Sequence, residues 1–157
     1  MGLREDIMTE TVDQLPLRRA VTVTPETSTE QAIKLMRESQ LGCVFVVDEF
    51  DRPMGKFTER QVLSLVCDCD PLDGPVLNHM VPIPDCGCVK KSDPIAKVLH
   101  GMRETRLRFL CVIDDKGKVV ALTGQKGLME YITEHFPRQI KVQMMASKLH
   151  MNSREGA

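Results

Sequence analysis

The sequence predicts an α/β fold of the α+β type, in which two β-α-β-β-α units are related by a pseudo-two-fold axis. The first observation is a repeat, because the phrase "MRESQLGCVFVVDE" at 36–49 returns as "MRETRLRFLCVIDD" at 102–115, 66 positions later. The second is that each phrase joins apolar residues at helical spacing to a short β-branched run. The third is size: one unit of about 50 residues is small for independent stability, whereas two units can cover each other's sheets.

The first helix of each unit has its own start signal. Thr27 followed by Glu30 is typical of a capping box. At the matched position Asp93 is a favourable N-cap, and Pro94 suits the first helical turn. The apolar positions behind these starts have helical spacing: Ala32, Ile33 and Met36 in the first unit, and Ile95, Val98, Leu99 and Met102 in the second.

Strands surround this helix, and a second helix closes each unit. Opening strands are expected near 20–24 and 86–90, and the runs "CVFVV" and "FLCVI" form the next strands. Polar turns then lead back into strands near 54–57 and 119–122. The apolar side of the closing helix is expected to consist of Val62, Leu63 and Val66 in the first unit, and of Leu128, Met129, Ile132 and Phe136 in the second.

The repeat also predicts how the chain is divided. The expected segments are an N-terminal lead-in at 1–19, a first unit at 20–67, a linker at 68–85, a second unit at 86–137 and a C-terminal tail at 138–157. The linker is rich in Pro and Asp, which is typical of a connecting segment. The tail lacks apolar periodicity and is expected to be partly disordered.

Composition excludes several classes of protein. The net charge is −1 over 157 residues, which is a poor electrostatic match for a duplex nucleic-acid binder. No apolar run is long enough to span a membrane, and the N-terminal residues contain no secretory signal. We therefore expect a cytoplasmic protein with no nucleic-acid or membrane partner, in which the six cysteines are reduced thiols.

The two phrases "MRESQLGCVFVVDEFDRPMGKFTERQVL" and "MRETRLRFLCVIDDKGKVVALTGQKGLM" together resemble a CBS-domain pair, also called a Bateman module. The resemblance covers roughly residues 6–136. It implies a regulatory role, in which adenosine-containing ligands such as AMP, ADP, ATP or S-adenosylmethionine bind in clefts between the units. It also implies a homodimer, commonly a flat disc, and an unidentified protein partner. No cofactor is required, and the module is expected to stand alone without enzymatic activity.

The resemblance implies a ligand site at the start of the last helix of each unit. Family members place a Thr or Ser there for phosphate and an Asp three residues later for the ribose hydroxyls. The first unit reads "GKFTERQ", in which Gly55 and Thr58 fit and Gln61 replaces the Asp. A neutral Gln would weaken ribose binding by on the order of 1–2 kcal/mol. The alternatives are that Thr58 is only a helix N-cap and that Gln61 is an ordinary exposed helix residue.

The second unit lacks both side chains. In its "ALTGQKG" stretch, Gly124 replaces the hydroxyl residue and Gly127 replaces the Asp. A shift of one residue would place Thr123 and Lys126 at these positions instead, which does not restore the acid. Since glycines let a ligand approach the backbone closely, a different anion is the remaining candidate for this site.

Two further residues complete the expected ligand-binding set. The resemblance implies a basic residue just before the second core strand, aimed at phosphate, and Arg108 occupies that position in the second unit. A solvated surface charge is the alternative reading of Arg108. Val23, on the opening strand of the first unit and paired with Val89 in the repeat, is the other member of the set.

Two Cys-x-Cys pairs suggest a different chemistry. Cys67 and Cys69 form one pair, and Cys86 and Cys88 form the other. Four thiolates suit tetrahedral Zn²⁺, although zinc pairs are usually spaced more widely. The alternative is that these cysteines, like Cys43 and Cys111 in the core strands, are small buried hydrophobes.

Three hypotheses for function follow. The first is a ligand-sensing module for an adenosine nucleotide that uses the cleft at Thr58. The second is a CBS scaffold whose ligand sites have lapsed and which acts by dimerisation or by docking to a partner protein. The third is a cysteine-based metal or redox sensor. The sequence contains no recognisable nucleophile–base arrangement that would support an enzyme.

Overall fold

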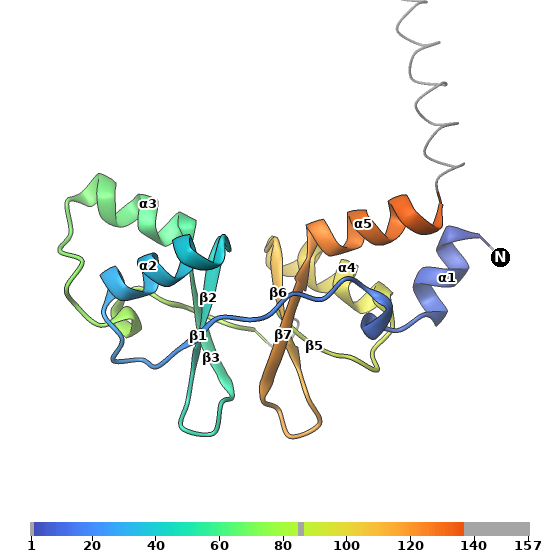
Figure 1. Ribbon diagram of the computed structural model, residues 1–157, viewed down its shortest axis with the longest axis horizontal. Coiled ribbons are helices and arrows are strands. Elements are labelled where there is room, and N and C mark those ends of the chain that lie inside the picture. Colours follow the sequence, from blue (N-terminus) through green and yellow to red (C-terminus); the bar gives the residue numbers. More distant parts are fainter. Residues whose placement is uncertain (1, 85–86, 137–157) are drawn as a thin grey trace, which may run out of the picture.

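The computed structural model describes residues 2–84 and 87–136, so the expected tail at 138–157 lies outside the described residues. The chain forms two similar units that lie side by side (Figure 1). The first unit consists of β1 (Thr22–Val23), α2 (Thr29–Ser39), β2 (Cys43–Val47), β3 (Pro53–Thr58) and α3 (Glu59–Asp68). The second consists of β5 (Cys88–Lys90), α4 (Ile95–Thr105), β6 (Phe109–Ile113), β7 (Val119–Gly124) and α5 (Gln125–His135). The remaining elements are α1 (Leu3–Thr9), β4 (Val81–Pro82) and two short 3₁₀ turns, Val12–Gln14 and Val76–Asn78.

The two sheets have the same pairing, which confirms the α+β class. The first has the order β1-β2-β3-β4 and the second the order β5-β6-β7. In each, the opening strand is parallel to the central strand, and the next strand is antiparallel to it. Even the irregularities match, because the register shifts after Val46 in β2 and after Val112 in β6.

The hairpin turns are built in the same way in both units. Asp48 accepts hydrogen bonds through Oδ1 from the backbone N–H groups of Phe50 and Arg52, at 2.9 and 2.8 Å. Asp114 accepts from the backbone of Lys116 and Lys118, at 2.8 and 2.9 Å. An aspartate that satisfies the turn amides in this way fixes where each hairpin reverses. These backbone bonds hold the pKa of Asp114 below its usual range.

Both predicted helix starts were one residue early. The α2 helix is capped by Ser28, whose hydroxyl accepts from the Gln31 N–H at 3.2 Å, and α4 begins at Ile95 after Pro94. Thr27 instead accepts from the Thr24 N–H at 3.2 Å, and Asp93 accepts from the Lys90 N–H at 2.7 Å. Thr27 and Asp93 therefore have the same role, since each side chain closes the turn between a strand and the following helix.

The lead-in and the linker each complete a core, and neither is only a connector. Val12 from the lead-in is buried in the core of the second unit, and Val76 from the linker is buried in the core of the first. The Val12 N–H donates to the Asp93 carbonyl at 2.9 Å, and the Val76 N–H donates to the equivalent Thr27 carbonyl at 2.7 Å. The N-terminal segment thus packs on the second unit first and then runs across to β1 of the first unit (Figure 1).

The two sheets meet through an apolar cluster. Cys43 and Phe45 of β2 pack there with Cys111 of β6 and Leu122 of β7. All four side chains are at most 2% exposed. This contact fixes the positions of the two units and thereby shapes the clefts between them.

The closing helices bury only part of the expected apolar residues: Val62 packs against the core of the first unit, and Leu128, Ile132 and Phe136 pack against the core of the second. In α3, Leu65 is buried, whereas Leu63 and Val66 are 64% and 61% exposed. In α5, Leu128 is buried as expected, but Met129 is 53% exposed. These helices lie at the edge of their units, so only one narrow side of each faces a core. None of the described helices is long and apolar enough to cross a membrane.

Candidate functional site

A cleft of about 550 Å³ lies between the two units, within the size range of small-molecule sites. The first unit contributes the end of β3 and the start of α3, and the second contributes the segment that leads into β6. Thr58, Gln61 and Arg108 all line this cleft, so the structure brings together three of the residues expected from the sequence. We call it the first cleft.

Thr58 and Gln61 are engaged with each other. Thr58 is the N-cap of α3, and its hydroxyl accepts from the Arg60 N–H at 3.3 Å. Gln61 closes a capping box, because its Oε1 accepts from the backbone N–H of Thr58 at 3.1 Å and from the Thr58 hydroxyl. The Glu59 N–H donates to the Gly42 carbonyl at 3.1 Å. The first amides of α3 therefore already have acceptors, and side chains must supply the affinity for an anion in this conformation.

Lys56 is a cleft residue that the sequence analysis did not identify. It lies on β3, two residues before Thr58, and the residue is only 3% exposed. Its cross-strand neighbours are Phe45 and Val81, so its aliphatic stem lies among apolar side chains while the residue lines the first cleft. Burial lowers the pKa of Lys56 to about 8, although the nearby Cys43 acts in the opposite direction. A comparison of the two repeats could have identified Lys56, because the second unit has an apolar residue, Leu122, at the position where the first unit has this lysine.

The first cleft is predominantly basic. Besides Lys56, three arginines line it: Arg60, Arg106 and Arg108. The described residues that line the cleft include one acid, Glu59. Burial raises the pKa of the nearby Cys43 thiol to about 12, so Cys43 is neutral near pH 7 and does not balance this charge.

A second cleft of about 720 Å³ occupies the equivalent place on the other side. Lys126 from α5 lines it together with Arg18 and Arg19 from the lead-in, and Gln40 and Leu41 form part of the opposite wall. Arg18 is partly neutralised, because it lies 3.5 Å from Glu130. This cleft therefore contains positive charge but no hydroxyl residue at the start of the helix.

The glycines of the second unit serve packing. A Cβ at Gly124 would lie 2.0 Å from the Arg108 carbonyl oxygen, and a Cβ at Gly127 would lie 3.0 Å from the Pro16 carbonyl oxygen. Neither glycine is among the residues that line the second cleft. The Thr123 hydroxyl, which a shifted alignment would use, is buried and has no hydrogen-bond partner.

Two residues of the expected ligand set lie elsewhere. Val23 is 6% exposed and belongs to the core of the first unit. Gly55 allows close packing of the linker, because a Cβ there would lie 2.6 Å from the sulfur of Met80. The side chain of Val23 thus contributes to the core, and Gly55 supports β3 from the linker side.

Of the four cysteines of the zinc hypothesis, the structure describes Cys67, Cys69 and Cys88. Cys67 and Cys69 are exposed at the end of α3, whereas Cys88 pairs in register with Cys111 across the second sheet. Cys86 lies outside the described residues. Within the parts of the chain that the structure describes, no group of three or more His, Cys, Asp or Glu side chains could hold a metal ion.

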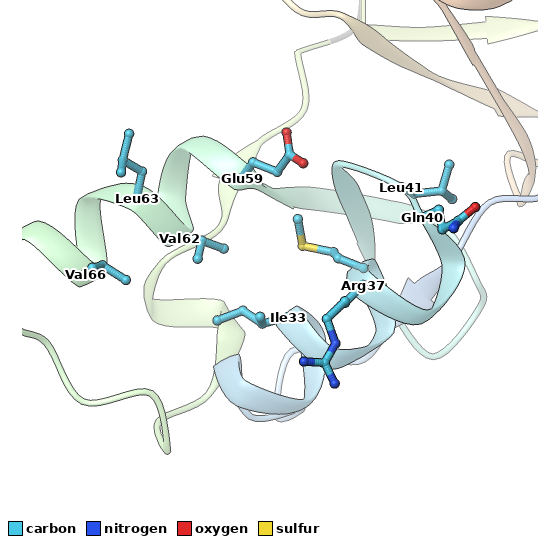
Figure 2. Close-up of a pocket in the computed structure, with 9 residues that line it drawn as sticks. Ile33, Arg37, Gln40, Leu41, Glu59, Val62, Leu63 and Val66 are labelled. Carbon is cyan, nitrogen blue, oxygen red and sulfur yellow. The ribbon is translucent and has the colours of Figure 1, made fainter.

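The first unit also carries an apolar groove of about 530 Å³ between α2 and α3. Ile33 and Met36 line it from α2, and Val62, Leu63 and Val66 line it from α3 (Figure 2). Arg37 and Glu59 lie at its margin (Figure 2). Exposed apolar side chains gathered in this way are typical of a protein–protein contact.

Comparison with known proteins gives consistent matches. A family model described as the CBS domain matches residues 5–68 and 79–134. An uncharacterized 17.7 kDa protein of Acidianus ambivalens is 27% identical over 121 residues, which are 77% of this chain and 72% of that protein. Uncharacterized protein MK0525 of Methanopyrus kandleri is 27% identical over 120 residues, which are 76% of this chain and 61% of that protein.

Solved structures share the fold. A CBS domain protein from Pyrobaculum aerophilum, solved in complex with AMP, has a TM-score of 0.68 at 19% identity and covers 87% of this chain and 98% of its own. The CBS domain pair of protein MJ0100, solved with 5′-methylthioadenosine and S-adenosylmethionine, has a TM-score of 0.69 at 15% identity. The match covers 79% of this chain and 96% of that one. An uncharacterized conserved protein from Pyrococcus horikoshii has a TM-score of 0.68 at 24% identity. The match covers 78% of this chain and 92% of that one.

Proposed function

This chain belongs to the CBS domain family, and from that premise we propose that it is a non-catalytic regulatory module that senses an adenosine-containing ligand. The ligand would bind in the first cleft, and its presence would be passed to a partner protein. The observation that carries this proposal is the convergence of Thr58 and Gln61 from one unit with Arg108 from the other. The fold neighbours solved with AMP or with S-adenosylmethionine support the choice of ligand class.

The chemistry of the first cleft suits such a ligand in part. The Thr58 hydroxyl can donate to a phosphate or ribose oxygen once it leaves Gln61, and Gln61 offers an amide in place of the family's carboxylate. Because a neutral amide binds ribose hydroxyls more weakly than a carboxylate does, we expect modest affinity, in the micromolar to millimolar range.

Isothermal titration tests the proposal directly. The purified protein is titrated with AMP, ADP, ATP and S-adenosylmethionine in turn, and Thr58→Ala is titrated beside it. We expect saturable heat with at least one ligand and roughly tenfold weaker binding by the variant. Thr58→Ser, which retains the hydroxyl, is the matched control and is expected to bind as the natural protein does.

The second cleft offers a further check on the location of the ligand. Lys126→Met removes a charge from the second cleft and leaves the first unchanged. If the ligand binds in the first cleft, this variant binds normally. Silence with all four ligands at millimolar concentration would instead favour a scaffold whose sites have lapsed, since the capping box already occupies the Gln61 oxygen.

We also propose that two copies of the chain meet through the apolar helix faces. Leu63 of α3 and Met129 of α5 occupy matched positions and are both exposed, at 64% and 53%. A second copy carries the same pair of faces, so a symmetric contact would cover both units of each chain. Sedimentation equilibrium tests this: a dimer is expected for the natural protein, and Leu63→Glu together with Met129→Glu is expected to yield a monomer that retains its helical circular dichroism. Exposed Val120→Glu, on the second sheet, is the control.

A further inference from the structure

We propose that Lys56 is the buried cation of an anion-binding subsite in the first cleft, and that it makes this cleft select ligands that carry phosphate. This inference rests on the proposed function for the adenosine part of the ligand. It adds that the first cleft prefers phosphate and that Lys56 is the residue responsible. Free nucleotides and other compounds with a phosphate or pyrophosphate group form the ligand class. Cationic ligands such as S-adenosylmethionine would be disfavoured.

The placement of Lys56 is the main argument. A lysine side chain is seldom buried unless it is paired, because removing an ammonium group from water is costly. Lys56 is 3% exposed, yet among the residues that the structure describes its ammonium group has no hydrogen bond and no ion pair with a carboxylate. It lines a cleft that opens between the units. The Lys56 ammonium group is therefore available to bind an anion, and a bound anion would serve as the counterion that the ammonium group lacks.

The neighbouring groups favour the same ligand class. Lys56 and Thr58 are two residues apart on β3, so their side chains leave the same face of the sheet. Arg60, Arg106 and Arg108 line the cleft as well, and the acid among its described residues is Glu59. The first amides of α3 already have acceptors, so the binding of a phosphate depends on these cationic side chains.

The repeat provides an internal comparison for this inference. At the position that matches Lys56, the second unit has Leu122, which is 2% exposed in the apolar cluster between the sheets. The fold therefore accommodates an apolar residue at this point. The charge at Lys56 is not needed to build the strand, and burial disfavours it, as its lowered pKa indicates. A ligand is the explanation that accounts for both observations.

The test compares ligands and variants by isothermal titration at pH 7. AMP, ATP and inorganic pyrophosphate carry phosphate, whereas adenosine and S-adenosylmethionine do not. We expect the first three to bind more tightly than the last two, and Lys56→Met to weaken them by about 10- to 100-fold. Lys116→Met, which removes an exposed lysine from the hairpin turn of the second unit, is the control and should leave all affinities unchanged.

Proton uptake gives a readout that a purely structural role would not change. At pH 8.5 part of the Lys56 population is neutral, so binding of a phosphate ligand should take up protons in the natural protein and not in Lys56→Met. Titration in buffers of different ionisation enthalpy measures this uptake. The other ionisable groups near Lys56 are Cys43 and Glu59, and Cys43→Ala and Glu59→Gln should both retain the uptake.

The outcomes separate this inference from the proposed function. If adenosine or S-adenosylmethionine binds as tightly as AMP and Lys56→Met binds normally, the inference is wrong and the adenosine-sensing function stands. If pyrophosphate binds through Lys56 but no adenosine compound binds better than pyrophosphate, the anion subsite stands and the adenosine function is wrong. If none of the five compounds binds, both are wrong.

Discussion

Three positions on the final strand and helix differ in character between the two units: Lys56, Thr58 and Gln61 in the first, and Leu122, Gly124 and Gly127 in the second. One backbone contact beside them is shared by the two units. The Glu59 N–H donates to the Gly42 carbonyl at 3.1 Å, and the matched Gln125 N–H donates to the Arg108 carbonyl at 3.2 Å. The same backbone contact therefore forms with different side chains at these positions, so the start of the closing helix does not depend on the chemistry of the cleft.

The residues at these three positions have different roles in the two units. The second unit brings the Arg108 and Pro16 backbones against its glycines and gains close packing there. The first unit keeps polar side chains at the same positions and has a cleft lined by them. Variants that exchange residues between the units therefore test whether one position can serve both close backbone packing and a ligand-binding cleft.

The largest effect is expected when the hydroxyl of the first unit is introduced into the second. In Gly124→Thr, the new Cβ would lie 2.0 Å from the Arg108 carbonyl oxygen, so the chain must move. We expect a loss of about 3 kcal/mol or more in the free energy of unfolding, measured by urea denaturation. The reciprocal Thr58→Gly removes only a helix cap and should cost about 1 kcal/mol or less. Equal losses would show that the glycine is not required for packing.

A gain in stability is expected when Lys56 is replaced by the residue of the second unit. Lys56→Leu removes a buried charge and should raise the free energy of unfolding by about 1–3 kcal/mol at pH 7 without ligand. Because burial lowers the folded pKa of Lys56 to about 8, the unfolded chain binds more protons between pH 8 and the ordinary lysine value of 10.5. The stability of the natural protein should therefore rise with pH across this window, and the advantage of the variant should shrink.

Urea unfolding at pH 7, 8.5 and 10 measures this difference. Lys116→Leu controls for the loss of an exposed lysine and should show no such trend. A destabilised Lys56→Leu would mean that the cation supports the fold itself and would weaken the case for a ligand.

A smaller effect is expected at the helix cap of the first unit. Thr58→Ala removes the acceptor for the Arg60 N–H and should cost about 1 kcal/mol in thermal unfolding. Thr58→Ser should recover most of that stability, because the hydroxyl is retained. A neutral Thr58→Ala would indicate that Gln61 caps the helix without it.

The smallest effect concerns the turns between strand and helix, where Thr27 and Asp93 are equivalent. Burial by itself would raise the pKa of Asp93, but the Lys90 N–H and the Lys97 ammonium lower it overall. The stability from Asp93 should therefore be complete above the ordinary Asp pKa and be lost as the pH falls through the folded value. Asp93→Thr should reduce this acid sensitivity and cost about 1 kcal/mol or less at pH 7, as measured by unfolding at pH 3 to 7. An unchanged acid slope would show that other carboxylates cause the sensitivity.

Local interactions explain what could be predicted from the sequence. The strands "CVFVV" and "FLCVI" occur where expected, since β-branched runs and the turns at Asp48 and Asp114 depend on neighbours a few residues away. The two starts of α2 and α4 were misplaced by one residue, because Thr27 and Asp93 had two local uses and the closing of the turn prevailed. Thr58, Gln61 and Arg108 were identified as cleft residues through the family resemblance.

The sequence by itself determined the two β-α-β-β-α units, because a repeated pattern of apolar and polar residues specifies the same short-range bonds twice. The tertiary structure decided which surfaces those units cover. The crossing of the lead-in to the second core, the exposure of Leu63 and the burial of Lys56 all depend on contacts between segments far apart in the chain. Whether a side chain on β3 faces water or another sheet is set by the segment that packs against it, and no local pattern carries that information.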